Sequence, residues 1–154
     1  MPATVKQVDR VSIAVRSLER ARAFFERHFG ARFGAVEDVK DQGYRYVPFT
    51  IAGFTLELLE PYVPDNPIAR FIERRGEGVY QLSLLVEDLD EAARALEGEG
   101  LSVMARRGYP EDVTFEGFHW REGFVHPRDA FGVLIHLGER RPAKGEAAPP
   151  SRPA

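Results

Sequence analysis

An internal repeat constrains the fold of this chain more than any other feature of its sequence. Residues 8–18 return as residues 79–89 with the same pattern of aliphatic side chains, and residues 53–60 return as residues 132–139. A chain that repeats a whole supersecondary unit typically contains two copies of one module packed together. We therefore expect two modules of the same architecture, one in each half of the chain.

Four polar residues interrupt the repeated apolar strands, and they fall at equivalent places in the two copies. Arg10 and Gln81 lie in the opening strands, whereas Glu57 and His136 lie in the closing strands. A buried charged or polar side chain needs a partner or a ligand, because burying it alone is costly. These four residues are the first candidates for a functional site.

Local patterns place the secondary structure within each copy. Residues 8–15 alternate between polar and apolar side chains, which is typical of a strand. Ser17 and Gly30 suit the two ends of the helix that follows, and Asn66 and Asp88 are capping residues for two further helices. We expect strands at residues 8–15, 31–36, 44–50 and 54–60 in the first copy, and one from Val79 and others at 101–106, 122–126 and 132–138 in the second. We expect helices from Leu18 to Phe29, from Ile68 to Arg74 and from Leu89 to about Gly98.

The order of these elements is βαβββ, a helical linker, and βαβββ again. One copy alone would leave a sheet face uncovered, so we expect an α+β fold in which the paired modules form a curved, half-open barrel with the helices outside. The length of 154 residues fits one domain. This domain should span residues 1–138, with modules at 8–60 and 79–138 and a linker at 61–78, and the Pro- and Ala-rich residues 139–154 should form a disordered tail.

Composition excludes several classes of function. The net charge of −3 and the lack of a Lys/Arg block argue against a nucleic-acid partner. Without cysteine the chain has no disulfide, no thiolate metal site and no cysteine nucleophile. No apolar stretch approaches the roughly 18 residues of a membrane span, and the N-terminus lacks the apolar core of a signal peptide. We expect a cytoplasmic protein that binds a small molecule and has no membrane partner.

Residues 107–121 are rich in aromatic side chains and are punctuated by Pro and Gly. Two interpretations are open for them: a loop that closes one end of the core, or an aromatic lid over a ligand. On the second interpretation, Trp120 and Phe118 contact the substrate. Tyr46, in the strand at 44–50, and Gln81 are the other candidate substrate-binding residues.

Several segments resemble the vicinal oxygen chelate superfamily, which includes glyoxalases, bleomycin-resistance proteins and extradiol dioxygenases. The resemblance is carried by residues 9–23, 56–61, 66–78, 124–127 and 132–135. Within the superfamily these segments look most like methylmalonyl-CoA epimerases, and the run from Pro67 to Gly78 is the most epimerase-like part. The resemblance implies paired βαβββ modules, a homodimer, and a site built from the polar strand residues.

The resemblance also implies a metal site, but this chain departs from the expected ligands. The family usually has His at the positions of Arg10 and Gln81 and Glu at that of His136, so Glu57 alone keeps a typical ligand type. A further catalytic Glu of the family falls where this chain has Tyr44, Arg45 and Tyr46. Arginine stays protonated and cannot coordinate a metal. No cofactor is therefore favoured, although a divalent metal held by Glu57, Gln81 and His136 remains an alternative, as does an ion pair between Arg10 and Glu57.

The chemistry that fits these residues is proton abstraction from the carbon next to a carbonyl. His136 is the candidate base, because an imidazole titrates near neutral pH. Glu57 would act as a base, orient His136 or position Arg10, and Arg10 would hold the developing oxyanion. The leading hypothesis is an isomerase or lyase of the glyoxalase or epimerase type acting on a small acyl or 2-oxo substrate. A metal-free, resistance-type binding protein is the alternative. A dioxygenase ranks last because the complete set of two histidines and one carboxylate is missing.

Overall fold

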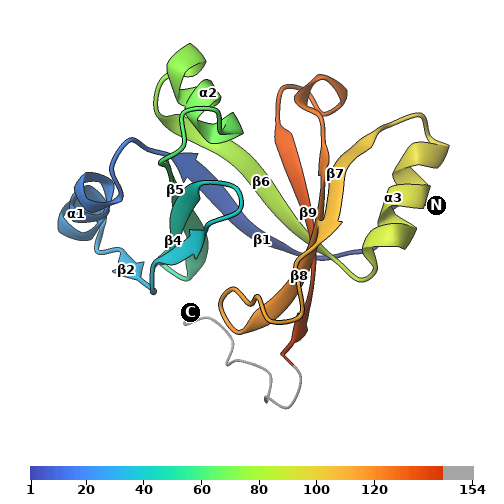
Figure 1. Ribbon diagram of the computed structural model, residues 1–154, viewed down its shortest axis with the longest axis horizontal. Helices are drawn as coiled ribbons and strands as arrows, with labels where there is room; N and C mark the ends of the chain where they lie inside the picture. The colour runs from blue at the N-terminus through green and yellow to red at the C-terminus, as the bar shows by residue number, and fades with distance from the viewer. Residues whose placement is uncertain (144–154) are drawn as a thin grey trace. The chain divides into compact units, whose positions relative to one another are not determined.

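The computed structural model describes residues 1–143, which divide into two compact units (Figure 1). The first unit is Arg10–Tyr80. The second unit combines Met1–Asp9 with residues 81–143. The boundary falls within two strands, at residues 5–14 and 78–86, and each strand is assigned to the unit that holds most of its module. The N-terminal residues belong to the second unit because the amide of Glu87 donates to the Thr4 carbonyl at 3.2 Å. No helix in residues 1–143 is both long and apolar enough to span a membrane.

The first unit contains the first βαβββ module and the helix of the linker. Its strands follow the order β2-β4-β5-β1, with β3 also paired to β4. The elements are β1 (Val5–Ala14), α1 (Leu18–Phe29), β2 (Arg32–Phe33), β3 (Glu37–Val39), β4 (Tyr44–Ile51), β5 (Phe54–Pro61) and α2 (Pro67–Arg75).

The second unit contains the second module. Its strands follow the order β6-β9-β8-β7. The elements are β6 (Gly78–Val86), α3 (Leu89–Gly98), β7 (Val103–Gly108), β8 (Phe118–Val125), the 3-10 helix η1 (Pro127–Asp129) and β9 (Leu134–Pro142). Together the two units confirm the predicted α+β class and the two βαβββ modules.

Strand register shows that the two modules are copies of each other. In the first unit β1 runs parallel to β5, and Ser12 stands opposite Glu57. In the second unit β6 runs parallel to β9, and Ser83 stands opposite His136. The opening and closing strands of each module therefore pair in the same register, as the sequence repeat predicts.

In each module the same two contacts stabilise the start of the helix that follows the opening strand: a side-chain cap and a carboxylate from the closing strand. Ser17 caps α1 and Asp88 caps α3 through side-chain oxygens that accept backbone amide bonds. In addition, Glu60 accepts a 2.7 Å bond from the amide of Leu18, and Glu139 accepts one of the same length from the amide of Leu89. A carboxylate at this end of a helix also interacts favourably with the helix dipole.

A separate apolar core lies between helix and sheet in each unit. In the first unit Phe49 stacks on Phe33, with ring centroids 4.7 Å apart, and also contacts Phe25. In the second unit Gly123 allows β8 to approach the core closely, because a Cβ there would lie 2.9 Å from a methyl carbon of Val103. The helical face of each sheet is thus filled by hydrocarbon, and the polar strand residues belong to the other face.

The structure differs from the predicted elements at three places. A short strand, β3, was not expected, and β8 begins at Phe118 instead of residue 122. The predicted disordered tail was to begin at residue 139, but β9 continues to Pro142 because residues 139–142 pair with the first residues of β8. The rest of the predicted tail, residues 144–154, lies outside the described residues.

Candidate functional site

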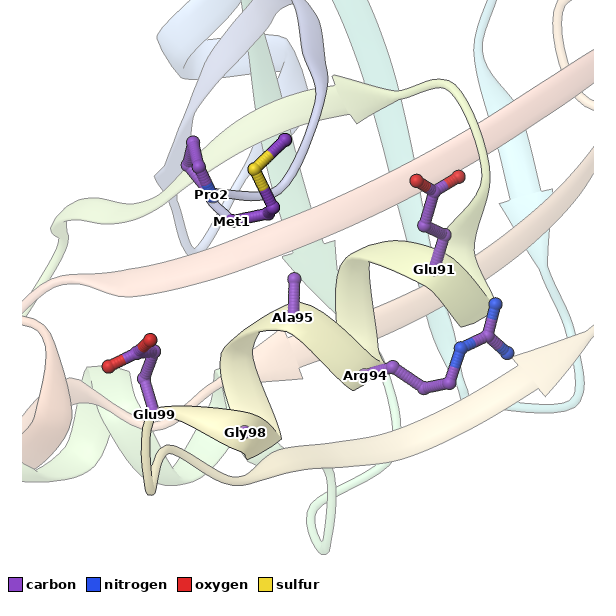
Figure 2. Close-up of a pocket in the computed structure, with 7 residues that line it drawn as sticks. All are labelled: Met1, Pro2, Glu91, Arg94, Ala95, Gly98 and Glu99. Atoms are coloured by element: carbon purple, nitrogen blue, oxygen red, sulfur yellow. The ribbon is translucent and has the colours of Figure 1, made fainter.

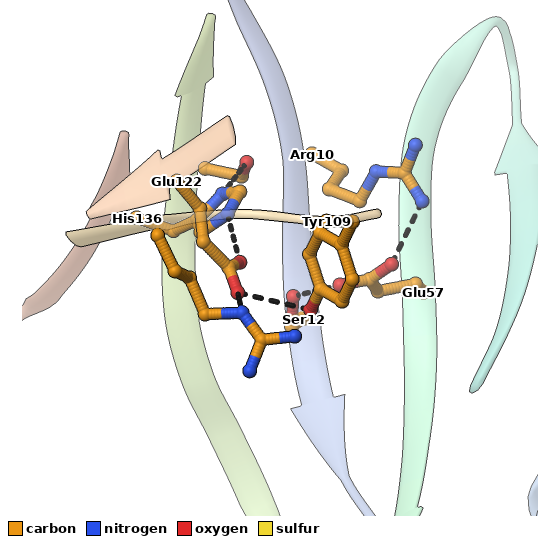
Figure 3. A network of polar contacts seen from close by, with 8 residues as sticks. Arg10, Ser12, Glu57, Tyr109, Glu122 and His136 are labelled. Atoms are coloured by element: carbon orange, nitrogen blue, oxygen red, sulfur yellow. Dashed lines mark hydrogen bonds and ion pairs between the residues drawn. The ribbon is translucent and has the colours of Figure 1, made fainter. Parts of the chain in front are cut away.

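The first unit holds a buried cluster of Arg10, Ser12 and Glu57 on β1 and β5. The Arg10 guanidinium donates to Glu57 Oε2 at 2.7 Å, and the Ser12 hydroxyl donates to Glu57 Oε1 at 2.6 Å. Figure 3 shows Arg10 pointing at the carboxylate. Arg10 is 4% exposed and Glu57 is 7% exposed. Both carboxylate oxygens therefore have a charged or hydroxyl donor, and the side chains are almost fully shielded from solvent.

The Arg10–Glu57 ion pair constrains what either residue can do. Two opposite charges removed from water must compensate each other, and loss of one partner leaves an uncompensated buried charge. The pair is the geometry expected if Glu57 positions Arg10. Glu57 is correspondingly less suited to act as a free base, because both of its oxygens already accept hydrogen bonds.

The second unit holds a cluster around His136 that combines Ser83 and Glu122. The Ser83 Oγ atom lies 2.6 Å from His136 Nδ1, and Glu122 Oε2 lies 3.0 Å from His136 Nε2. The side chains of His136 and Glu122 are only 12% and 10% exposed. Figure 3 shows the imidazole of His136 directed at the carboxylate of Glu122. Both ring nitrogens of His136 are thus engaged within the second unit.

Glu122 is itself anchored by two further residues. The Tyr109 hydroxyl donates to Glu122 Oε1 at 3.0 Å, and the Nε atom of Arg107 lies 3.5 Å from the same oxygen. The Arg107 guanidinium also lies over the Tyr109 ring, 4.0 Å from its centroid. A chain of polar contacts therefore runs from Arg107 and Tyr109 through Glu122 to His136.

The electrostatics of this cluster keep Glu122 ionised at neutral pH. Burial by itself raises the pKa of Glu122, but the hydrogen bond and charge of His136, the Tyr109 hydroxyl and the Arg107 charge outweigh it and hold the pKa below its ordinary value. An ionised carboxylate can only accept hydrogen bonds. His136 must therefore carry a proton on Nε2 when it contacts Glu122.

The same position in the two modules carries different chemistry. Tyr46 stands opposite Leu59 in the first module, and Glu122 stands opposite Gly138 in the second, so the register makes Tyr46 the counterpart of Glu122. Tyr46 is buried, and its ring centroid lies 6.0 Å from the Arg10 guanidinium carbon. The first module thus has an aromatic ring beside an ion pair, and the second has a carboxylate beside an imidazole.

The other predicted substrate-binding residues have varied surroundings. Gln81 is half-buried on β6, two residues before Ser83 and on the same strand face. Trp120 is buried, and its indole N–H donates to the Phe115 carbonyl at 3.0 Å. Phe118 packs edge-on against Trp120, with centroids 6.4 Å apart. The contacts of these two aromatic residues favour the interpretation in which their segment closes one end of the core.

The four polar residues predicted from the repeat identified part of each cluster: Arg10 and Glu57 in the first unit and His136 in the second. Glu122 was missed. The predicted strand began at residue 122, so the alternation of side chains did not show which sheet face Glu122 lies on. The first module also has no carboxylate at the equivalent position. The available signal was the equivalence with Tyr46, which requires aligning the middle strands of the two modules. Ser12 and Ser83 were visible as an identical pair in the repeat, but nothing in the sequence identified what they contact.

These residues do not fit a divalent metal. Within residues 1–143, no group of three His, Cys, Asp or Glu side chains is placed to hold one. The oxygens of Glu57 accept from a cation and a hydroxyl, and the nitrogens of His136 are bonded to Ser83 and Glu122. A metal at Glu57 would have to displace Ser12 and tolerate the charge of Arg10. A metal at His136 would have to displace Ser83 or Glu122.

A surface hollow of about 360 Å³ lies elsewhere in the second unit (Figure 2). Its lining combines the N-terminus with one face of α3, and it contains none of the polar strand residues. Its charged side chains come from exposed helix positions rather than from a buried network. The lining residues are Met1, Pro2, Glu91, Arg94, Ala95, Gly98 and Glu99.

Comparison with known proteins agrees with the resemblance found in the sequence. The chain is 33% identical over 135 residues to an ethylmalonyl-CoA/methylmalonyl-CoA epimerase from Cereibacter sphaeroides, covering 86% of this chain and 97% of the relative. It is 31% identical over 136 residues to the uncharacterized Bacillus subtilis protein YqjC, covering 88% and 93%. The crystal structure of methylmalonyl-CoA epimerase from Mycobacterium tuberculosis superposes with a TM-score of 0.77 and 32% identity, covering 92% and 93%. Residues 7–137 match the family model as well, and the chain belongs to the Glyoxalase/Bleomycin resistance protein/Dioxygenase superfamily.

Proposed function

We propose that this protein is an isomerase that moves a proton at the carbon next to the carbonyl of an acyl-CoA thioester. The observation that carries the proposal is the largely buried imidazole of His136, 12% exposed, held between Ser83 and the ionised carboxylate of Glu122. An imidazole with a carboxylate partner is a common arrangement for proton transfer. The acyl-CoA substrate class comes from relatives named as methylmalonyl-CoA epimerases.

The proposed step begins with cleavage of the C–H bond next to the carbonyl. The proton passes to Nδ1 of His136, which is the only ring nitrogen with a lone pair while Nε2 donates to Glu122. The Ser83 hydroxyl turns away from Nδ1 to admit it. The electron pair of the broken bond is delocalised onto the carbonyl oxygen as an enolate. A solvent proton delivered to the opposite face of the planar carbon inverts its configuration, and His136 then releases its proton to solvent. Glu122 stabilises the imidazolium that forms between the two transfers.

Arg10 is the proposed anion-binding group. A guanidinium is a permanent cation whose planar N–H donors match the oxygens of an anionic group, so its charge would attract such a group of the substrate. Glu57 is proposed to keep Arg10 in place, and Tyr46 and Gln81 are the proposed substrate-binding residues of the first and the second unit. We also propose that the reaction needs no metal. The oxygens of Glu57 already bond to Arg10 and Ser12, and the ring nitrogens of His136 already contact Ser83 and Glu122, so these atoms are poor metal ligands.

The test is hydrogen exchange in D₂O. The purified protein is incubated with methylmalonyl-CoA, other acyl-CoA thioesters and 2-oxo compounds, and deuterium incorporation next to the carbonyl is measured by mass spectrometry. We expect catalysed exchange with at least one thioester, and we expect His136→Ala to reduce it by roughly 10²–10⁴-fold, as is typical for a lost general base. Elimination products from the same panel would identify a lyase instead.

A second function, binding of a small molecule without turnover, is favoured by one specific observation. Both nitrogens of His136 and both oxygens of Glu57 already have partners within their own units. On this alternative, Arg10→Ala and His136→Ala would lower only the affinity. Tight binding across the panel with no exchange in the wild-type protein would rule out the isomerase and support the binding protein.

We further propose that the protein is a cytoplasmic homodimer. In the second unit the strand order ends at β7, which leaves an edge that pairing with another chain can cover. Light scattering at tens of micromolar should give twice the mass of the 17.4 kDa chain. A monomeric mass would contradict the dimer.

A further inference from the structure

We propose that Glu122 is the positioning residue of His136: its carboxylate fixes the imidazole in the tautomer that carries the proton on Nε2 and leaves Nδ1 as the basic nitrogen. The inference rests on the proposed proton transfer and adds the group that selects which nitrogen takes part in it. Glu122 acts through His136 and has no assigned contact with substrate.

The geometry gives Glu122 one well-defined orientation. It projects from β8 beside β9, and its Oε2 atom accepts from His136 Nε2 at 3.0 Å. Its Oε1 atom accepts a hydrogen bond from the Tyr109 hydroxyl at 3.0 Å and lies 3.5 Å from the Nε atom of Arg107. A carboxylate held at both oxygens can orient an imidazole, whereas a free one would rotate with it. Burial of Glu122 also keeps water from competing for either oxygen.

The two partners of the imidazole differ in what they can accept and donate. Glu122, ionised at neutral pH, only accepts, so it requires a proton on Nε2. Ser83 can donate to Nδ1 when the ring is neutral, and it can accept from Nδ1 when the ring is charged, because its hydroxyl rotates. The carboxylate therefore sets the tautomer, and the serine follows the protonation state at its distance of 2.6 Å.

The comparison between modules supports a specific role. Ser12 and Ser83 are equivalent and both bond to the closing-strand residue opposite them. The counterpart of Glu122, however, is Tyr46, which has no carboxylate. The carboxylate thus accompanies the module that has histidine on its closing strand. The βαβββ architecture does not itself require a carboxylate at the position of Glu122, because the first module has the same architecture with Tyr46 at that position.

The test is nitrogen NMR of the imidazole ring, which needs no substrate. In the ¹⁵N-labelled wild-type protein at neutral pH, the signals of His136, assigned by their loss in His136→Gln, should report a single tautomer protonated on Nε2. Glu122→Gln keeps the side-chain shape but allows the amide to donate, so a population protonated on Nδ1 should appear. Glu139→Gln is the matched control: it removes a carboxylate from β9 that bonds to Arg121 and the amide of Leu89, and the tautomer should not change.

Kinetics provides the second readout. If the wild-type protein catalyses exchange, Glu122→Gln should lower kcat by at least roughly tenfold with little change in KM, as expected for loss of a group that orients a base. Identical ring signals in the wild-type protein and Glu122→Gln would overturn the inference. A tautomer shift in Glu122→Gln, in a protein whose wild type exchanges no substrate, would support the positioning role and overturn the proposed function instead.

Discussion

Ser83 and His136 stand opposite each other on β6 and β9, and the serine hydroxyl oxygen lies 2.6 Å from Nδ1 of the imidazole. Ser12 and Glu57 stand in the same relation on β1 and β5, also with a 2.6 Å contact. The serine is thus the constant part of both modules, and the residue it contacts is the variable part. One module presents a carboxylate to the serine and the other presents an imidazole.

The two serines should differ in their contribution to stability. Ser12→Ala removes a hydrogen bond to a charged group and should lower the free energy of unfolding by about 2 kcal/mol, whereas Ser83→Ala should cost about 1 kcal/mol. Both serines are buried, so neither alanine is compensated by water. Urea unfolding of the two variants measures the difference. Equal losses would mean that the charge of Glu57 adds nothing to its bond with Ser12.

The Arg10–Glu57 pair should show strong non-additivity. Arg10→Met leaves Glu57 buried without its counter-charge and should destabilise the protein by roughly 3–5 kcal/mol, and Glu57→Leu should do the same for Arg10. The double variant removes both charges and should be much less destabilised than the sum of the single changes. Urea unfolding of all four proteins completes the cycle. Additive losses would show that the two side chains do not compensate each other in solution.

Stability should depend on pH through Glu122. Its folded-state pKa is lowered, so the ionised form contributes stability above the ordinary value of 4.5, and this contribution is lost as pH falls from there toward the folded-state pKa. Glu122→Gln cannot titrate, so it should be less stable than the wild-type protein at neutral pH. The difference in stability between the wild-type protein and Glu122→Gln should become smaller as the pH falls below about 4.5. Thermal unfolding of both proteins across this pH range measures the difference. A difference that does not change with pH would contradict a lowered pKa for Glu122.

The carboxylates at the two helix starts should be nearly equivalent. Glu60→Gln and Glu139→Gln each remove a negative charge from the amide of the first helical residue, at Leu18 and Leu89 respectively. Each should lower the free energy of unfolding by about 1 kcal/mol. The matched control is Glu99→Gln. Its exposed side chain lies at the C-terminal end of α3, where a negative charge is unfavourable, so this change should not destabilise the protein. If only one of the two variants loses stability, the two contacts are equivalent in geometry but contribute unequally to the free energy of unfolding.

Metal should neither be retained nor stabilise the protein. Elemental analysis of purified protein should show less than stoichiometric transition metal, and millimolar Zn²⁺ or Mn²⁺ should leave the Tm unchanged, because the donors of Glu57 and His136 are already bonded within the protein. A chelator should likewise leave any hydrogen exchange intact. About one tightly held metal per chain, found without added metal, would overturn this expectation.

Much of the fold was accessible from the sequence because it depends on local chemistry. Caps at Ser17, Asn66 and Asp88 and the left-handed Gly30 mark helix ends through bonds to neighbouring residues. Strand β3 and the first half of β8 were missed, since their pairing with β4 and with residues of β9 far along the chain decides them. The extension of β9 past residue 138 has the same cause.

The sequence by itself determined that the chain is two copies of a βαβββ module and that Arg10, Glu57, Gln81 and His136 are equivalent polar positions, because a repeat and a strand period of two are properties of residue order. Only the tertiary structure decided the partners. It assigned Glu57 to Arg10 and Ser12, and it gave His136 the carboxylate of Glu122. Which side chains meet across strands depends on register and on which face each strand presents, and a shift of one residue would have reversed every one of these contacts.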